Sequence, residues 1–343
     1  MYQFDQLATA YGEPPIKGHI KSADADFVVD EIMPIIPSGQ GEHLWLHIEK
    51  RGCNTDWLAQ QLAKISGVKS MAVSYAGMKD RHAVTTQWFS VHLPGQQDPD
   101  LSLLENDSIK ILQSCRHDRK LKRGALSGNR FRLCIRELSG SLDQLQQRLE
   151  LIKRKGVPNY FGEQRFGFGM NNLNRAEQMF GRQLKRLKKH QRGLYLSSAR
   201  SWIFNQVLST RIWQNNWDQY LPGDVFMLDG KSACFADDDS DMTDRLLQLE
   251  IHPTGCLWGE GESLASDECL RIEQTIASNN ALLSKGLEDA RLKQERRSLR
   301  LVPANLNWQI EKDNVFNVEF ELLAGSFATM VLREFVEVLN NNR

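Results

Sequence analysis

The sequence of 343 residues lacks the features that define several large functional classes. It has no run of about 18 apolar residues, which excludes a membrane-spanning helix. Its first residues show no basic segment followed by an apolar stretch, so we predict no export signal and expect a cytoplasmic protein. Lys plus Arg equals Asp plus Glu at 43 each, and this balance does not by itself indicate a partner that is a polyanion.

The motifs that bind common cofactors are also missing. No GxxxxGK(S/T) phosphate loop, HExxH, GxSxG or complete GxGxxG occurs. The six cysteines are widely spaced, with no CxxC pair and no nearby histidine at zinc-ligand spacing, which is typical of reduced, buried thiols. We therefore predict no metal and no cofactor, so that any reaction must use ordinary side chains.

Basic residues are nevertheless concentrated in two stretches, at 116–123 (RHDRKLKR) and 182–192 (RQLKRLKKHQR), while acidic residues collect at 237–241 and 260–273. A basic cluster on a neutral protein either contacts phosphates or forms a solvated face. The candidates for contact with RNA in these stretches are Arg119, Lys122, Lys185, Lys188 and Lys189.

Alternating apolar residues dominate both ends of the chain. This period of two predicts strands at 16–21, 27–32, 43–50, 86–93, 108–113, 129–137, 306–310 and 315–322. The 43–50 pattern is that of a half-buried strand, and the 129–137 pattern places three arginines opposite the apolar face. One helix between Thr55 and Gly67 interrupts these strands.

Helical patterns dominate the middle of the chain, at 142–155 and 196–212, where Trp202, Phe204, Val207 and Leu208 are expected in a core. A last helix is predicted at about 326–339. Because a chain of this length exceeds one ordinary domain, we predict that residues 1–154 and 304–343 form one α+β core with a mixed or antiparallel sheet. Residues 155–303 would be an inserted domain.

The segment SYAGMKDRHAVTTQWFSV holds the strongest candidate for chemistry, Asp80. A carboxylate is ionised at neutral pH and can act as a nucleophile without a separate base, provided that a cation holds it. Neighbours on an extended segment point to opposite faces, which favours a partner from elsewhere over Lys79 or Arg81. The alternative is a tight surface turn in which aspartate serves the turn geometry.

Three further stretches suit a nucleotide. NYFGEQRFG combines glycines with Tyr160 and Arg165, which could stack on bases or reach a phosphate, or could equally pack into a core. GNRF places Asn129 and Phe131 on one face, as an amide for a base edge and a ring beside it. GSFAT places Phe327 at the start of a helix.

In this order and over the full length, GMKDRHAVT, NYFGEQRFG, GNRF and GSFATMVLRE resemble the conserved blocks of the TruD family of tRNA pseudouridine synthases. The resemblance implies an α+β pseudouridine synthase core interrupted by an α/β TRUD domain. It implies an isomerase without a cofactor that acts on tRNA, at uridine 13 of the D arm. We expect a monomer.

The resemblance also implies roles for individual residues. Asp80 would be the nucleophile, and Phe27, Asn129 and Phe327 would line the uridine pocket. Phe131 would take the stacking role that many pseudouridine synthases give to a tyrosine. The motifs do not identify the cation beside Asp80, for which we favour Lys21 and then Arg333.

The target nucleotide would have to flip out of folded RNA before reaction. Asp80 could then attack the sugar C1′, attack uracil C6, or remove the 2′ proton, and the sequence does not choose among these routes. Two rival functions remain at this point: a non-catalytic RNA-binding protein, and an N-glycosidase that would release free uracil.

Overall fold

The computed structural model describes residues 2–184, 186–236, 241–311 and 314–339. Its chain forms two compact units, which we call the sheet unit and the helical unit. The sheet unit comprises Ile16–Ser141, Pro303–Gly325 and the residues from Glu337 onward, and the helical unit comprises Met1–Pro15, Leu142–Val302 and Ser326–Val336. None of the described helices is both long enough and apolar enough to cross a membrane.

The sheet unit is built on a mixed sheet in the order β14-β15-β7-β2-β5-β3-β6. β2 and β5 run parallel, whereas β2–β7 and β3–β5 are antiparallel, so the predicted α+β class with a mixed sheet is confirmed. β1 lies beside β7, β16 beside β1, and β4 beside β5. The strands are β1 (Ile16–Ile20), β2 (Phe27–Ile32), β3 (His43–Arg51), β4 (Val73–Tyr75), β5 (Val84–His92), β6 (Ile109–His117), β7 (Gly128–Gly140), β14 (Ala304–Glu311), β15 (Val315–Leu323) and β16 (Val336–Val338).

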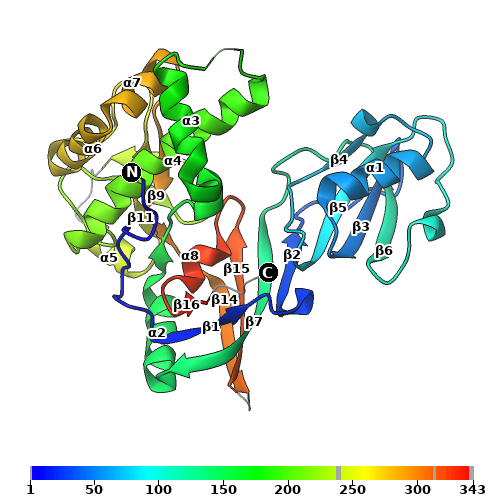
Figure 1. The fold of residues 1–343 in the computed structure, drawn as a ribbon, viewed down its shortest axis with the longest axis horizontal. Coiled ribbons are helices and arrows are strands. Elements are labelled where there is room, and N and C mark those ends of the chain that lie inside the picture. Colours follow the sequence, from blue (N-terminus) through cyan, green and yellow to red (C-terminus); the bar gives the residue numbers. More distant parts are fainter. Residues whose placement is uncertain (1, 185, 237–240, 312–313, 340–343) are drawn as a thin grey trace. The chain divides into compact units, whose positions relative to one another are not determined.

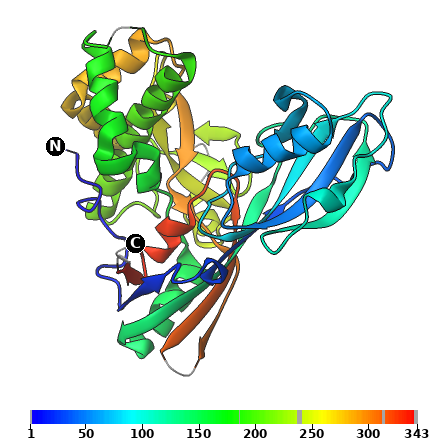
Figure 2. The same cartoon turned by 45° about the vertical axis from the view of Figure 1, so that its right-hand side comes forward.

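Helix α1 (Thr55–Ile65) covers one face of β3, β5 and β6, as Figures 1 and 2 show. Its Leu58 and Leu62 pack against Leu46 of β3 and Phe89 of β5 in a fully buried cluster. The sequence predicts a half-buried β3 with its other face open to solvent. The structure differs, because this second face is also covered. Trp45 is 1% exposed, because Leu121 and Leu126 from the segment before β7 cover it.

The outward face of β7 carries the three predicted arginines, and each has a carboxylate partner. Arg130 pairs with Glu321, Arg132 with Asp30, and Arg136 with Asp26. On the inward face, Phe131, Leu133 and Ile135 are buried. The alternation read from the sequence therefore describes this strand correctly.

The helical unit contains a four-stranded sheet in the order β10-β9-β11-β12 and a two-stranded pair of β13 with β8. Its helices are α2 (Leu142–Lys155), α3 (Asn171–Phe180), α4 (Lys189–Trp213), α5 (Met242–Leu247), α6 (Asp267–Asn279), α7 (Ala281–Asp289) and α8 (Ala328–Leu332). Its strands are β8 (Val157–Pro158), β9 (Val225–Leu228), β10 (Cys234–Ala236), β11 (Ile251–Leu257), β12 (Glu295–Ser298) and β13 (Arg300–Leu301).

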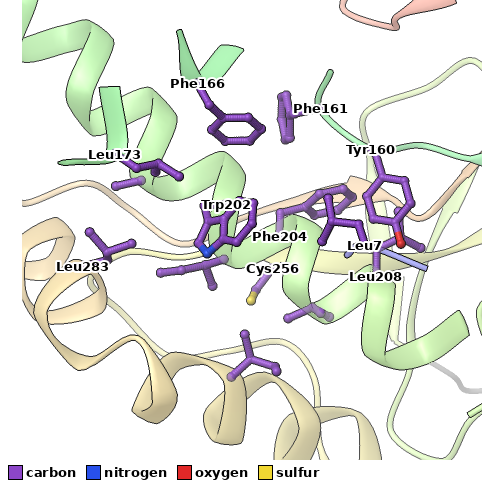
Figure 3. Close-up of a cluster of buried hydrophobic side chains, with 14 of the residues drawn as sticks. Leu7, Tyr160, Phe161, Phe166, Leu173, Trp202, Phe204, Leu208, Cys256 and Leu283 are labelled. Carbon is purple, nitrogen blue, oxygen red and sulfur yellow. The ribbon is translucent and has the colours of Figure 1, made fainter. Parts of the chain in front are cut away.

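Helix α4 is the central element of this unit. Trp202, Phe204, Val207 and Leu208 are all buried, as predicted, in a cluster that also contains Leu7 from the N-terminal segment. In Figure 3, Trp202 and Phe204 lie in one cluster with Tyr160, Phe161 and Phe166 of the NYFGEQRFG segment and with Leu283 of α7. The N-terminal residues and the NYFGEQRFG segment thus share one core with α4.

The predicted last helix is wrong beyond Leu332. Helix α8 ends there, turn hydrogen bonds join Glu334 to Val331 and Phe335 to Leu332, and residues 336–338 form β16. Two causes are visible. Phe335 and Glu334 are both buried, so consecutive residues face the interior, and β-branched valines at 336 and 338 favour a strand.

The compact units divide the chain differently from the two predicted domains. The N-terminal 15 residues and the segment Ser326–Val336 cluster with the middle of the chain rather than with the sheet. A division by contacts is not a test of an insertion, so the predicted boundaries at 154 and 304 stay a prediction.

Candidate active site

Asp80 lies in the segment between β4 and β5, with its side chain 41% exposed. One carboxylate oxygen forms an ion pair with the ammonium group of Lys21. The other accepts a hydrogen bond of 3.1 Å from the backbone N–H of His82. The carboxylate is therefore fixed on one side by a cation and on the other by the turn itself, while part of it faces solvent.

Lys21 reaches Asp80 from an unusual backbone conformation. Its φ is +56°, which for a residue with a side chain costs roughly 1–2 kcal/mol. Its Nζ also lies 4.3 Å from the centroid of the Phe27 ring. One cation thus joins the carboxylate to an aromatic face, and strain of this kind is often found at functional sites.

The protonation of Asp80 is decided by two opposing effects. Burial alone would raise the pKa of this carboxyl, but the hydrogen bond and the positive charge of Lys21 outweigh burial and lower the pKa below its ordinary value of 3.8. Asp80 is therefore a carboxylate throughout the neutral pH range and requires no base to be ready for reaction.

The backbone around Asp80 is anchored from beneath by two more lysines. Lys79 Nζ lies 2.5 Å from a carboxylate oxygen of Glu31, and both side chains are buried. Lys50, which is fully buried, donates hydrogen bonds to the carbonyl oxygens of Asp80 (3.1 Å) and Cys53 (2.7 Å). These contacts hold the main chain while Lys21 holds the side chain.

We did not single out Glu31 or Lys50 from the sequence, although the sequence contains a signal for both. Glu31 shares the inward face of β2 with Phe27 and Val29, and Lys50 continues the core-facing series Leu44, Leu46 and Ile48. A charged residue at a position where the period calls for an apolar one indicates a buried polar partner. Here Glu31 pairs with Lys79 and Lys50 donates to the carbonyl of Asp80, so both partners lie in the segment that carries Asp80.

The predicted pocket residues of the sheet unit lie on the same inward face. The rings of Phe27 and Phe131 meet edge to face at 6.4 Å, and Phe131 also packs on Phe320 at 5.5 Å. Asn129 lies opposite Glu31 in the β2–β7 pairing. Its amide oxygen is buried and has no hydrogen-bond partner among the described residues.

Phe327 belongs to the helical unit, where NYFGEQRFG holds it. Its ring lies 6.2 Å from that of Phe161, and the Arg165 guanidinium lies 5.9 Å from its centroid. Gly162 allows this close approach, because a Cβ at this position would lie 3.1 Å from the Phe327 ring, which is tighter than ordinary van der Waals contact. The motif therefore positions Phe327, and the predicted place of Phe327 in a uridine pocket stays a prediction.

Two other candidates have structural partners within the helical unit. Arg333 donates hydrogen bonds to the carbonyl oxygens of Leu7 and Ala8 and lies over the rings of Phe4 and Tyr160. Tyr160 is 1% exposed and donates to the carbonyl of Ala8. We correct its expected role on this ground, because a side chain buried in the core has no surface to offer RNA.

The remaining cationic candidates lie at the surface. Arg119, Lys122, Lys188 and Lys189 are exposed, and Arg165 is half-buried with a hydrogen bond of 3.1 Å to Ser197. Lys185 falls outside the described residues. Among the described residues, no group of three or more His, Cys, Asp or Glu side chains could hold a metal ion.

Comparison with known proteins shows the family of this chain. The sequence profile described as tRNA pseudouridine synthase D (TruD) matches residues 4–170 and 168–335, which together span almost the whole chain. The chain belongs to the TruD family. The segments that carry Asp80, Asn129 and Phe327 all lie inside the matched ranges.

Individual relatives agree with this assignment. A tRNA pseudouridine synthase D from Hydrogenovibrio crunogenus is 47% identical over 333 residues, which cover 97% of this chain and 96% of the relative. One from Methylococcus capsulatus is 48% identical over 336 residues, covering 97% and 95%. A crystal structure from Methanosarcina mazei assigned to TruD superposes with a TM-score of 0.72 at 21% identity, covering 96% of this chain and 95% of that one, and shows the same fold.

Proposed function

We propose that this TruD-family chain isomerises a uridine of tRNA to pseudouridine with Asp80 as the nucleophile. The observation that carries the proposal is the ion pair between Asp80 and Lys21, whose ammonium group also lies on the ring of Phe27. An ionised carboxylate beside an aromatic wall is what attack on a flipped nucleotide requires. Uridine 13 of the D arm, implied by the family resemblance, is the proposed position.

The reaction exchanges one bond between base and sugar for another. The bond from N1 to C1′ breaks, the uracil turns, and a new bond forms from C5 to C1′. The proton on C5 leaves to solvent and N1 gains a proton, so no electron donor or acceptor is needed. Attack at C1′, attack at C6 and removal of the 2′ proton all begin from an ionised Asp80, and the lowered pKa keeps the carboxylate ionised for any of these routes.

The side chains around Asp80 suit a uracil base. Phe27 and Phe131 offer ring faces and edges that would hold the detached base and keep water from the intermediate. The buried amide oxygen of Asn129 would accept the N3–H of uracil. A buried acceptor without a partner costs about 1–3 kcal/mol, and the substrate would remove that cost.

The flip of the target nucleotide costs a few kcal/mol, since stacking and pairing are lost. Contacts between RNA phosphates and the exposed Lys188 and Lys189 would offset this cost. In this proposal the surface cations supply affinity without sequence information, while Asn129 and the aromatic rings select the base.

The proposal is tested by release of tritium from tRNA labelled at uracil C5, together with mapping of the pseudouridine formed. The wild type should release tritium at one position, and Asp80→Asn should release none while it binds tRNA with unchanged affinity. Asp118→Asn, a change at an exposed aspartate of the same unit, should behave as the wild type. Turnover by Asp80→Asn would refute the assignment of the nucleophile.

The same assay separates the rival functions. A non-catalytic RNA-binding protein would bind tRNA without tritium release from any variant. An N-glycosidase would produce free uracil, which a chromatogram of the reaction detects. A pseudouridine at a position other than 13 would leave the reaction in place and correct only the target.

A further inference from the structure

A cavity of about 480 Å³ lies in the sheet unit and is lined in part by Arg81, the residue after Asp80. Its walls are the end of β3 (Arg51), the start of α1 (Asn54 and Trp57), the segment after Asp80 (Arg81) and the turn before β6 (Asn106). The volume falls within the range of about 300–1,000 Å³ that is usual for small-ligand sites. None of these residues takes part in the reaction described above.

Two arginines give this cavity a positive wall. The Nε of Arg81 donates a hydrogen bond of 3.3 Å to the carbonyl of Gly52, which ties the segment after Asp80 to the turn before α1. Neither Arg51 nor Arg81 has a carboxylate within 4.0 Å in the described part of the chain. The three arginines on the outward face of β7 have such partners, and Arg51 and Arg81 differ from them in having guanidinium groups that can pair with an anion.

The α1 side of the cavity offers an aromatic face and an amide. Trp57 is 47% exposed, because the core-facing positions of α1 are taken by Leu58 and Leu62. Asn54 precedes the helix, but its side chain makes no capping hydrogen bond and is exposed. An indole on which a base can stack, an amide for a base edge and two guanidinium groups for phosphates are together the components of a nucleotide site.

The position of the cavity limits which nucleotide it could take. Arg81 follows Asp80 directly, and consecutive Cα atoms are about 3.8 Å apart. Because Asp80 turns toward Lys21 while Arg81 turns toward Gly52, the cavity lies beside the reaction site and not within it. A nucleotide next to the target uridine in the strand would therefore lie near this cavity.

We propose that this cavity binds a nucleotide that flanks the target uridine in the tRNA strand, with its base on Trp57 and its phosphates on Arg51 and Arg81. The inference rests on the proposed function, since it needs an RNA substrate at Asp80. Holding a neighbouring nucleotide would keep the strand in its unstacked form and present the target to Asp80.

The test combines changes in the protein with changes in the RNA. Trp57→Ala should lower kcat/KM on natural tRNA by about 5- to 150-fold, the range for loss of one stacked base. Trp57→Phe should keep most of the wild-type kcat/KM. Two altered tRNAs are compared, one without the base 5′ of the target and one without the base 3′ of it. On one of these two tRNAs, Trp57→Ala should cause almost no further loss of kcat/KM. Trp213→Ala, at an exposed tryptophan that ends α4, is the matched control.

The phosphate contact has its own readout. Arg51→Gln should reduce the slope of log affinity against log salt by roughly 0.7, the value for one contact to single-stranded nucleic acid, whereas Trp57→Ala should leave the slope unchanged. Thermal unfolding checks that each variant is folded. The inference is wrong if Trp57→Ala behaves as Trp213→Ala, or if its loss is the same on tRNA without either flanking base. Failure of the wild type to form pseudouridine would instead refute the proposed function.

Discussion

The ammonium group of Lys79 lies 2.5 Å from the carboxylate of Glu31, with both side chains buried, although Lys79 is the chain neighbour of Asp80. Lys79 thus holds the backbone of the segment. The carboxylate of Asp80 pairs instead with Lys21, which lies 59 positions earlier in the sequence. Separate cations for the main chain and the side chain fix both the place and the charge of Asp80.

Removal of one partner of the buried pair should destabilise the protein strongly. Lys79→Met leaves the Glu31 carboxylate buried without a cation, and such a change costs about 3–5 kcal/mol. Urea unfolding measures this cost. The double variant Glu31→Leu/Lys79→Met should recover much of the stability, because no charge remains to be buried. A single Lys79→Met variant as stable as the wild type would contradict the burial of this pair.

Lys21→Met should change how activity depends on pH. In the wild type the charge of Lys21 outweighs burial and lowers the pKa of Asp80 below 3.8, so the ionised form persists well into the acid range. Without Lys21, burial raises the pKa, and the acid limb of the profile of kcat/KM against pH should move upward. Lys17→Met, which removes an exposed lysine paired with Glu337, is the control and should leave the limb in place. An unshifted limb in Lys21→Met would show that the cation acts in some other way.

The sequence predicted the elements of the sheet well, because period-two patterns such as those of β2 and β7 report directly which face is buried. The prediction was wrong where the buried residues do not follow a single helical or strand period along the sequence. Trp45 is covered by a loop whose position depends on distant contacts, and the residues after Leu332 face the interior consecutively. The ion pair of Glu31 with Lys79 was missed for a related reason, since a pairing across the sheet requires the register of its strands.

The surface candidates are tested by salt. If Lys188 and Lys189, both exposed at the start of α4, contact tRNA phosphates, then replacing both with glutamate should weaken binding and reduce its dependence on salt concentration. Filter binding at several salt concentrations gives the slope. The double variant Lys285→Glu/Lys293→Glu, at two lysines of the same unit whose side chains are 77% and 74% exposed, gives the same change in net charge and is the control. Equal slopes for the two variants would restore the reading of this cluster as a solvated face.

Glu334 should make folding stability depend on pH. Its side chain is buried, with the residue 1% exposed, and its carboxyl accepts a hydrogen bond of 3.0 Å from the backbone N–H of Ala10, which fixes the N-terminal segment to the turn after α8. Burial raises the pKa of Glu334 from 4.5 to about 7, in spite of the nearby charge of Arg333. The folded state therefore keeps a proton that the unfolded state loses in this window.

Stability from this group should consequently be highest below pH 4.5, fall as pH rises toward 7, and stay constant above it. At roughly 1.4 kcal/mol for each unit of pKa, the whole change is on the order of 3 kcal/mol. The difference in unfolding free energy between the wild type and Glu334→Gln, measured from pH 4 to 8, isolates it from other groups that titrate. Glu337→Gln, at an exposed carboxylate nearby in the chain, should show no such trend. A difference for Glu334→Gln that does not vary with pH would mean that this carboxyl titrates normally in the folded protein.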